Sequence, residues 1–256
     1  MNLLRAENIS LSFGGLTAVN DFNFYIDEGQ VVSIIGPNGA GKTTLFNILT
    51  GIYKVNQGNI YMNEEPIDGL HARKIVSKGI ARTFQNIRLF SDMRVIENVL
   101  VGSHINTNYS FFDGLFRTKR FYEVENLKKQ EGAKLLASLG LAQRLSDYAD
   151  NLSYGEQRKL EIARAMATGA KLLLLDEPAA GMNHQESEDL RVFIASLKKL
   201  GYTILLIEHD MRVVMNVSDY IYVMDYGKKI AQGRPHEIQS NEAVAMAYLG
   251  DSEVHL

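Results

Sequence analysis

Apolar runs and amphipathic segments alternate along much of the chain. Val31–Ile35, Lys171–Leu175 and Thr203–Ile207 are short, mostly apolar runs that end at glycine or acidic residues, a pattern typical of strands buried on both faces of a parallel sheet. Helical character is indicated for the segments Leu45–Leu49, Arg158–Ala167 and Asn183–Leu200. Alternating strands and helices favour a mostly parallel sheet with helices on both faces, so we expect an α/β fold.

Shorter strands punctuated by turns are expected on either side of the first buried run. Leu3–Phe13 and Phe22–Ile26 are separated by a break at Gly14–Gly15. Residues 57–59 are expected to turn the chain into a further strand at Ile60–Met62.

Strand patterns also occur before the middle of the chain and near its C-terminal end. Ile80–Phe84 predicts a strand that leads to Gln85. Asp225–Tyr226–Gly227 is typical of a hairpin turn between strands at Tyr220–Met224 and Lys228–Ala231. The tail, Pro235–Gly250, is expected to be helical.

Residues 86–150 are predicted to be helical rather than stranded. Helices are expected at Val95–Gly102 and Glu123–Leu139, with a short one near Ala142–Tyr148. The stretch 105–122 between the first two mixes aromatic and basic residues. Two interpretations stay open for it: a loop with a short helix packed on its own lobe, or an exposed surface that binds a partner.

Composition narrows the class of protein. The 256 residues are 46% hydrophobic and carry a net charge of −3, so the core can be large and no basic face for nucleic acid is expected. There is no cysteine and hence no disulfide framework. No apolar run approaches the roughly 18 residues that would span a bilayer, and the first ten residues lack the pattern of a secretion signal.

The stretch Val31–Thr44 has the pattern of a phosphate-binding loop between a strand and a helix. Glycine lets backbone N–H groups wrap closely around a polyphosphate, and the N-terminus of the following helix favours negative charge. Lys42 is expected to contact the β- and γ-phosphates of a nucleoside triphosphate, and the Thr43 hydroxyl is expected to ligate Mg²⁺. The predicted nucleotide contacts are Gly36, Pro37, Asn38, Gly39, Ala40, Gly41, Lys42, Thr43 and Thr44.

Acidic residues and a histidine follow two of the other buried strands. Asp176 comes directly after four leucines and is expected to hold Mg²⁺, while Glu177 is placed to activate a water for attack on the γ-phosphate. His209 follows the strand Thr203–Ile207. Because ligands of such sheets bind at the carboxyl ends of the strands, Lys42, Asp176 and His209 are expected to meet in one crevice.

With these motifs in their observed order, the chain resembles the nucleotide-binding subunits of ABC transporters over essentially its whole length. LSYGEQ, Leu152–Gln157, is similar to the family signature, and AAGMN, Ala179–Asn183, stands where the family has its D-loop. The resemblance implies that Gln85 senses Mg²⁺, that His209 contacts the γ-phosphate and that Phe13 stacks on adenine. It also implies a RecA-like core (1–85 and 158–256) with an N-terminal antiparallel β-subdomain, and a helical signature subdomain (86–157).

The signature implies that two subunits act together. In the family, each ATP lies between one subunit's phosphate loop and the other subunit's signature, so Ser153 and Gly155 are expected to contact the partner's ATP. Both are expected to precede the start of a helix. The sequence departs from the commonest form, LSGGQ, at Tyr154 and Glu156, and Asn183 stands near the usual D-loop aspartate. These departures bear on the geometry of the dimer interface.

Several longer stretches, among them RTFQNIRLFSDMRVIENVLVG and LSYGEQRKLEIARAMA, look like the LivG-type ATPases of branched-chain amino acid uptake systems. This resemblance implies integral membrane permease subunits, a second ATPase subunit (another copy or a LivF-like chain), an indirect link to a substrate-binding protein, and a peripheral position on the cytoplasmic face of the membrane. Related importers take up urea or other amides. A soluble ABC ATPase acting on DNA or ribosomes, and a phosphate-loop kinase, are the weaker alternatives.

Overall fold

The computed structural model of the protein describes residues 2–106 and 111–250. The chain forms two compact units. The first combines Met1–Arg82 with Leu172–Leu256, and the second is Thr83–Lys171.

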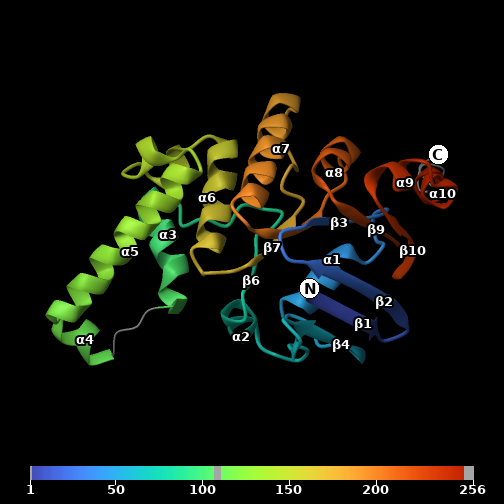
Figure 1. The fold of residues 1–256 in the computed structure, drawn as a ribbon, viewed down its shortest axis with the longest axis horizontal. Coiled ribbons are helices and arrows are strands. Elements are labelled where there is room, and N and C mark those ends of the chain that lie inside the picture. The colour runs from blue at the N-terminus through green and yellow to red at the C-terminus, as the bar shows by residue number, and fades with distance from the viewer. Residues whose placement is uncertain (1, 107–110, 251–256) are drawn as a thin grey trace. The chain divides into compact units, whose positions relative to one another are not determined.

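A six-stranded sheet forms the centre of the first unit (Figure 1). In the order β10-β9-β3-β8-β7-β6, the first strand is antiparallel to its neighbour and the other pairs are parallel, which confirms the expected mostly parallel sheet. The bounds are β3 (Val31–Ile35), β6 (Ile80–Arg82), β7 (Leu172–Asp176), β8 (Thr203–Ile207), β9 (Tyr220–Asp225) and β10 (Lys228–Gly233).

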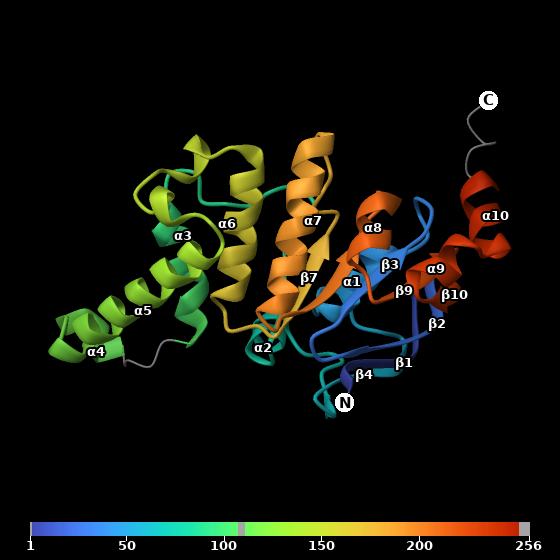
Figure 2. The same ribbon diagram turned by 45° about the horizontal axis from the view of Figure 1, so that its top comes forward.

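Helices cover both faces of this sheet (Figures 1 and 2). Val32 and Ile34 of β3 face the cluster that contains Phe46 of α1, whereas Ile35 faces the cluster that contains Val214 of α8. Because side chains alternate along a strand, α1 and α8 lie on opposite faces. The helices of this unit are α1 (Lys42–Leu49), α2 (Ala72–Ser77), α7 (His184–Lys199), α8 (Met211–Val217), α9 (Pro235–Gln239) and α10 (Glu242–Gly250).

Two details differ from the sequence predictions at the C-terminal side. The helix α8 was not predicted; Asp210 caps it by accepting a hydrogen bond from the N–H of Arg212. The tail is two helices rather than one, because the Asn241 side chain accepts hydrogen bonds from the N–H groups of Ala243 and Val244 and so begins a new helix.

A second sheet, antiparallel and four-stranded, has the order β2-β1-β4-β5. Its strands are β1 (Asn2–Phe13), β2 (Leu16–Asp27), β4 (Gln57–Met62) and β5 (Glu65–Pro66). β2 begins six residues before the predicted Phe22. The turn expected at residues 57–59 does not form, because these residues are part of β4. Gly58 lies opposite a bulge in β1 and has φ +91°. A β-carbon at this position would overlap the carbonyl oxygen of Asn8.

The second unit is helical in the described residues. Its α-helices are α3 (Val95–Ser103), α4 (Phe111–Phe116), α5 (Lys119–Ser138) and α6 (Tyr154–Met166). α5 begins four residues before the predicted Glu123, because Thr118 caps it by accepting a hydrogen bond from the N–H of Phe121. Only the 3₁₀ turn Ala142–Arg144 forms where a short helix was expected.

The signature helix also begins earlier than predicted. α6 starts at Tyr154 rather than Arg158, so Gly155 lies in its first turn and Ser153 is its N-cap. The predicted subdomain limit between residues 157 and 158 therefore falls inside a continuous helix. The compact units divide at 82/83 and 171/172 instead, while the functional subdivision of the chain stays a prediction.

The stretch 105–122 contains α4, and residues 107–110 lie outside the described residues. Phe112, Leu115 and Phe116 of α4 are between 61% and 70% exposed. This exposure favours the partner-surface interpretation over the packed-loop one.

Candidate functional site

The register of the parallel strands brings the predicted motifs of the first unit to one edge. Ile207 at the end of β8 pairs with Ile34 of β3 on one side and with Asp176 of β7 on the other. The carboxyl ends of the three strands are therefore level, with neighbouring strands about 4.8 Å apart. The phosphate loop, the Asp176–Glu177 pair and His209 all follow these ends, as the sequence predicted.

The phosphate loop, Gly36–Thr44, folds as a tight turn against β2 and β9. Gly36 has φ +151°, and a β-carbon there would overlap the carbonyl oxygen of Met224. Gly41 has φ +104°, and a β-carbon there would overlap the carbonyl oxygen of Ala18. Only glycine fits these two positions. Gly41 is the N-cap of α1 and supplies no side chain, so the first N–H groups of the helix remain available to an anion.

Lys42 lies inside this loop. Its side chain is buried, and its ammonium group donates hydrogen bonds of 2.6 and 2.8 Å to the carbonyl oxygens of Gly36 and Pro37. Thr43 is exposed in the first turn of α1 and Thr44 is half-buried. The loop thus concentrates a cation, a helix N-terminus and a hydroxyl group where a polyphosphate would be bound.

Asp176 forms a buried ion pair with Arg82. The Arg82 guanidinium donates a hydrogen bond of 2.6 Å to Asp176 Oδ2 and one of 2.7 Å to the side-chain oxygen of Asn47 on α1. The Arg82 and Asp176 side chains are each 6% exposed. Arg82 therefore joins β6, β7 and α1, and nothing in the predicted motifs identified it.

The donor set is compatible with Mg²⁺ bound together with phosphate. No group of three or more His, Cys, Asp or Glu side chains that could hold a metal occurs among residues 2–106 and 111–250. Mg²⁺ commonly takes one or two protein oxygen ligands and completes its shell with substrate phosphates and water. The Thr43 hydroxyl and the Asp176 carboxylate are ligands of that kind.

Glu177 and His209 lie beside each other after neighbouring strands. The carboxylate of Glu177 is 20% exposed and its Oε2 is 3.8 Å from Nδ1 of His209, whose side chain is 60% exposed. Glu177 has φ +44°, an unfavourable region for a residue with a side chain. Its N–H donates to the carbonyl oxygen of Ile207, so its backbone is attached to β8.

A second carboxylate, Glu208, lies between these two loops and was missed in the sequence. It is fully buried and accepts hydrogen bonds from the N–H groups of Ala179 (2.7 Å), His209 (2.9 Å) and Asp210 (3.2 Å). Burial raises the pKa of the Glu208 carboxyl, and the three backbone donors only partly oppose this effect. The sequence does place Glu208 directly after a buried strand, which is a possible sign of a functional carboxylate. Asp176 and Glu177 follow a buried strand in the same way, so this position alone did not show that Glu208 has a different role.

Phe13 lies at the end of the β1–β2 hairpin. It pairs with Leu16 across the turn, is 44% exposed, and makes an edge contact of 5.1 Å between ring centroids with Tyr53. Further along the same hairpin, Ala18 is close enough to Gly41 to exclude a side chain there. An exposed aromatic face is thus available on a hairpin that contacts the phosphate loop, and its predicted role stays open.

The signature residues belong to the second unit. The Ser153 hydroxyl caps α6 by accepting from the N–H of Glu156, and the Glu156 carboxylate accepts from both the N–H and the hydroxyl of Ser153. Arg144 also donates to Glu156, at 3.0 Å. Desolvation by burial raises the pKa of Glu156, but the hydrogen bonds from Ser153 and Arg144 prevail and lower it overall. A β-carbon added at Gly155 would have no heavy atom within 4 Å, so the space beside this glycine is open.

Gln85, in the same unit, is attached through its backbone to α6. Arg158 is fully buried and donates hydrogen bonds of 2.7 and 2.8 Å to the carbonyl oxygens of Phe84 and Gln85. Glu161 pairs with Arg158 at 2.8 Å and accepts from the N–H of Arg88. This buried pair was also missed, because charged residues on an amphipathic helix are normally expected at the surface.

Asn183, noted for replacing an aspartate, has a structural role here. It is the N-cap of α7: its side chain accepts from the N–H of Glu186 at 3.0 Å, and the Glu186 carboxylate accepts from its own N–H at 2.9 Å. This reciprocal capping box fixes the point where the segment Ala179–Asn183 becomes helix.

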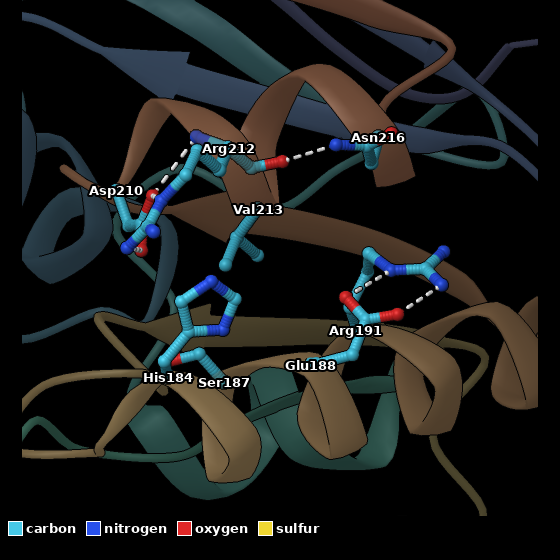
Figure 3. Close-up of a pocket in the computed structure, with 8 residues that line it drawn as sticks. All are labelled: His184, Ser187, Glu188, Arg191, Asp210, Arg212, Val213 and Asn216. Carbon is cyan, nitrogen blue, oxygen red and sulfur yellow. Dashed lines mark hydrogen bonds and ion pairs between the residues drawn. The ribbon is translucent and has the colours of Figure 1, made fainter.

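Two of the cavities in the first unit lie near residues discussed above. One, of about 300 Å³, borders the phosphate loop and is lined by residues 37–40, 225–226 and 246–247, so α10 approaches this loop. The other, of about 50 Å³, lies between α7 and α8, where His184 and Val213 face each other (Figure 3). Its charged side chains are paired with each other, Glu188 with Arg191 and Asp210 with Arg212, and it is too small for a nucleotide.

The comparison with known families decides the identity. The family model described as "ABC transporter" matches residues 19–180. This chain belongs to the ABC transporter ATPases. A second model, described as "Branched-chain amino acid ATP-binding cassette transporter", matches residues 228–254.

Relatives and solved structures agree with this assignment to the ABC ATPases. The chain is 47% identical to the high-affinity branched-chain amino acid transport ATP-binding protein BraF of Pseudomonas aeruginosa, and 45% identical to LivG of Escherichia coli K12. Each match covers 98% of both chains. A crystal structure of an ATP-binding cassette of an ABC transporter in its ADP conformation has a TM-score of 0.86 at 35% identity, covering 98% of this chain and 99% of the other.

The family membership confirms several expectations. ATP binding and hydrolysis are characteristic of ABC ATPases, and this one is similar throughout its length to subunits that power transport. In the described part of the chain, no helix is both long and apolar enough to cross a bilayer. Separately, the relatives are components of ABC transporters, which implies membrane permease partners.

Proposed function

We propose that this ABC ATPase drives the uptake of branched-chain amino acids. The observation that carries the proposal is the identity of 45–47% over 98% of both chains with relatives named for that transport. The match of residues 228–254 to the branched-chain amino acid model also supports it. No residue described here selects the amino acid, so the substrate is tested only in the whole transporter.

The first unit is proposed to carry out the hydrolysis. The N–H groups of Gly36–Thr44 and the Lys42 ammonium would hold the triphosphate, with the adenine on Phe13. Glu177 would accept the proton of the attacking water and His209 would contact the γ-phosphate. Thr43 and Asp176 would hold Mg²⁺, which would supply charge neutralisation at the β- and γ-phosphates. Gln85, in the second unit, stays the predicted Mg²⁺ sensor and ligand.

A second ATPase subunit is proposed to complete the site. Ser153, Gly155 and the N-terminus of α6 would be presented to the γ-phosphate bound by the partner, either another copy or a LivF-like chain. The Ser153 hydroxyl and the first turn of α6, which Gly155 leaves uncovered, support this role. Dimerisation would then depend on ATP, and hydrolysis would release it.

The exposed apolar side chains of α4 support a place for this chain beside membrane subunits, at the cytoplasmic face of the membrane. Phe112, Leu115 and Phe116 form such a group on one short helix. A substrate-binding protein would act on the ATPase only indirectly, through the permease, and no nucleic acid partner is proposed.

The test is hydrolysis of ATP by the reconstituted transporter with its membrane subunits and binding protein in vesicles. Leucine, isoleucine or valine, delivered by the binding protein, is expected to stimulate hydrolysis. Stimulation by urea alone would assign the ATPase to a related importer, and hydrolysis indifferent to every solute would refute the coupling. In parallel, Glu177→Gln is expected to trap an ATP-bound dimer; a wild-type rate in that variant would remove Glu177 from its role.

A further inference from the structure

Glu208 is a buried charged group of the first unit that the proposed mechanism does not use. Its two carboxylate oxygens accept from different loops. Oε1 takes the N–H of Ala179, two residues after Glu177, and Oε2 takes the N–H groups of His209 and Asp210. One side chain therefore connects the loop after β7 to the loop after β8.

The loop after β7 needs such an attachment. Glu177 has φ +44°, an unfavourable conformation that persists only where its surroundings hold it. Before this residue, β7 is held in the sheet, and the N–H of Glu177 itself bonds to Ile207. After it, the hydrogen bond from Ala179 to Glu208 fixes the chain to a buried, immobile group.

The loop after β8 is held by the same carboxylate. The backbone N–H groups of His209 and Asp210 both point to Glu208 Oε2, which sets the direction in which His209 leaves the strand. His209 Nδ1 is 3.8 Å from Glu177 Oε2 and also 3.8 Å from Glu208 Oε2. The relative position of the two proposed catalytic side chains thus depends on a third.

We propose that Glu208 is a positioning residue for ATP hydrolysis, whose carboxylate fixes Glu177 and His209 relative to each other. The inference rests on the roles proposed above for those two residues. Because Glu208 is fully buried, it acts through the two loops and not by contact with the nucleotide. Three backbone donors require a group with two acceptor oxygens at this position.

The substitution Glu208→Gln tests whether two acceptor oxygens are needed, because glutamine has nearly the same shape as glutamate. An amide has one acceptor oxygen, so its NH₂ group must face either the N–H of Ala179 or those of His209 and Asp210, and one loop loses its attachment. The rate of single-turnover hydrolysis is expected to fall by about 10- to 100-fold, the size of effect expected from a misplaced reacting group. The affinity for ATP is expected to stay within about twofold, because the phosphate loop is not attached to Glu208.

The matched control is Thr203→Val on the same strand. Thr203 is also fully buried, and its hydroxyl accepts the N–H of Gly29 at 2.9 Å, at the end of β8 away from the site. This variant is expected to lose stability but keep the wild-type hydrolysis rate. An equal loss of rate in both variants would show that Glu208 acts only on stability and would overturn the proposal.

Double mutants separate the positioning role from the proposed roles of Glu177 and His209. In a Glu177→Gln background, adding Glu208→Gln is expected to cost less than it does in the wild type, because one of the two positioned residues is already lost. Full additivity of the two losses would overturn the proposal, whereas a wild-type rate in Glu177→Gln alone would instead refute the role of Glu177.

Amide hydrogen exchange in the wild-type chain gives a readout that needs no variant. The N–H of Ala179 is expected to be protected to the level of the β8 amides, since its acceptor is fully buried. Exchange at the rate of an open loop would show that the attachment is not stable and would overturn the proposal.

Discussion

Replacing Arg82 with methionine is expected to destabilise the first unit by about 3–5 kcal/mol. Arg82 and Asp176 are each only 6% exposed and are joined by a hydrogen bond of 2.6 Å. Removing the guanidinium leaves a buried carboxylate without its counter-charge, which is the costly way to break such a pair.

Two smaller effects nearly cancel. The Asn47 side-chain oxygen loses a donor at 2.7 Å, worth about 1 kcal/mol. In the wild type the Arg82 guanidinium lies over the Phe46 ring, 5.5 Å from its centroid. A methionine side chain would pack against the same ring, and this contact is expected to contribute about 1 kcal/mol in return. The unpaired Asp176 therefore decides the magnitude.

Chemical denaturation followed by far-ultraviolet circular dichroism measures this loss, since the chain contains no tryptophan to report by fluorescence. Asp176→Asn alone is expected to cost a similar amount by leaving Arg82 without its partner. The double variant is expected to be more stable than the sum of the two losses predicts, by about 2 kcal/mol or more.

A loss below about 1 kcal/mol for Arg82→Met, the size found for exposed ion pairs, would refute this reasoning. Additive losses in the double variant would refute it as well, because they would mean that the two charges do not depend on each other. Arg191→Met is a suitable comparison, since that residue forms an exposed helical ion pair with Glu188 and is expected to matter little.

Three further predictions concern the loops. Gly36→Ala is expected to abolish nucleotide binding, measured by titration with ATP, because its β-carbon would overlap the Met224 carbonyl oxygen; binding at wild-type affinity would contradict the loop geometry. Ser153→Ala is expected to cost about 1 kcal/mol of unfolding free energy by loss of the α6 cap, and an unchanged denaturation midpoint would contradict the capping role. Arg212 donates hydrogen bonds to Asp210 and lowers the pKa of that carboxyl, so the pair's stabilisation is present above the ordinary pKa of about 3.8 and is lost as the pH falls below it. Asp210→Asn, which keeps a cap, should therefore be less stable than wild type near neutral pH but not in acid; a difference independent of pH would rule the pair out.

The elements that could be predicted were those with a single strong pattern. The buried runs of β3 and β8 were predicted to the residue, because an apolar run that ends at glycine or an acid leaves little freedom. The phosphate loop was equally clear, since each of its residue types has a chemical reason. Boundaries failed where a side-chain cap set the start of a helix, as with Thr118 and Ser153.

The supporting charges of the site could not be predicted. Arg82, Arg158 and Glu208 have no spacing that distinguishes them from surface residues, and each has at least one hydrogen-bond partner that is distant in the sequence. Glu208 also shows that a carboxylate after a buried strand has more than one use. The motif residues were found from their chemistry, and the residues that hold them in place needed the tertiary contacts.

The cap of α6 implies competition for one proton. The Ser153 hydroxyl donates to the Glu156 carboxylate, which Arg144 keeps ionised by hydrogen bonding. A phosphate that accepts a hydrogen bond from the Ser153 hydroxyl has to replace the Glu156 carboxylate as its acceptor. Until such a phosphate binds, the negative charge at the N-terminus of α6 is that of Glu156. Such an exchange of acceptors would make the signature unreceptive to weak anions and selective for a highly charged one.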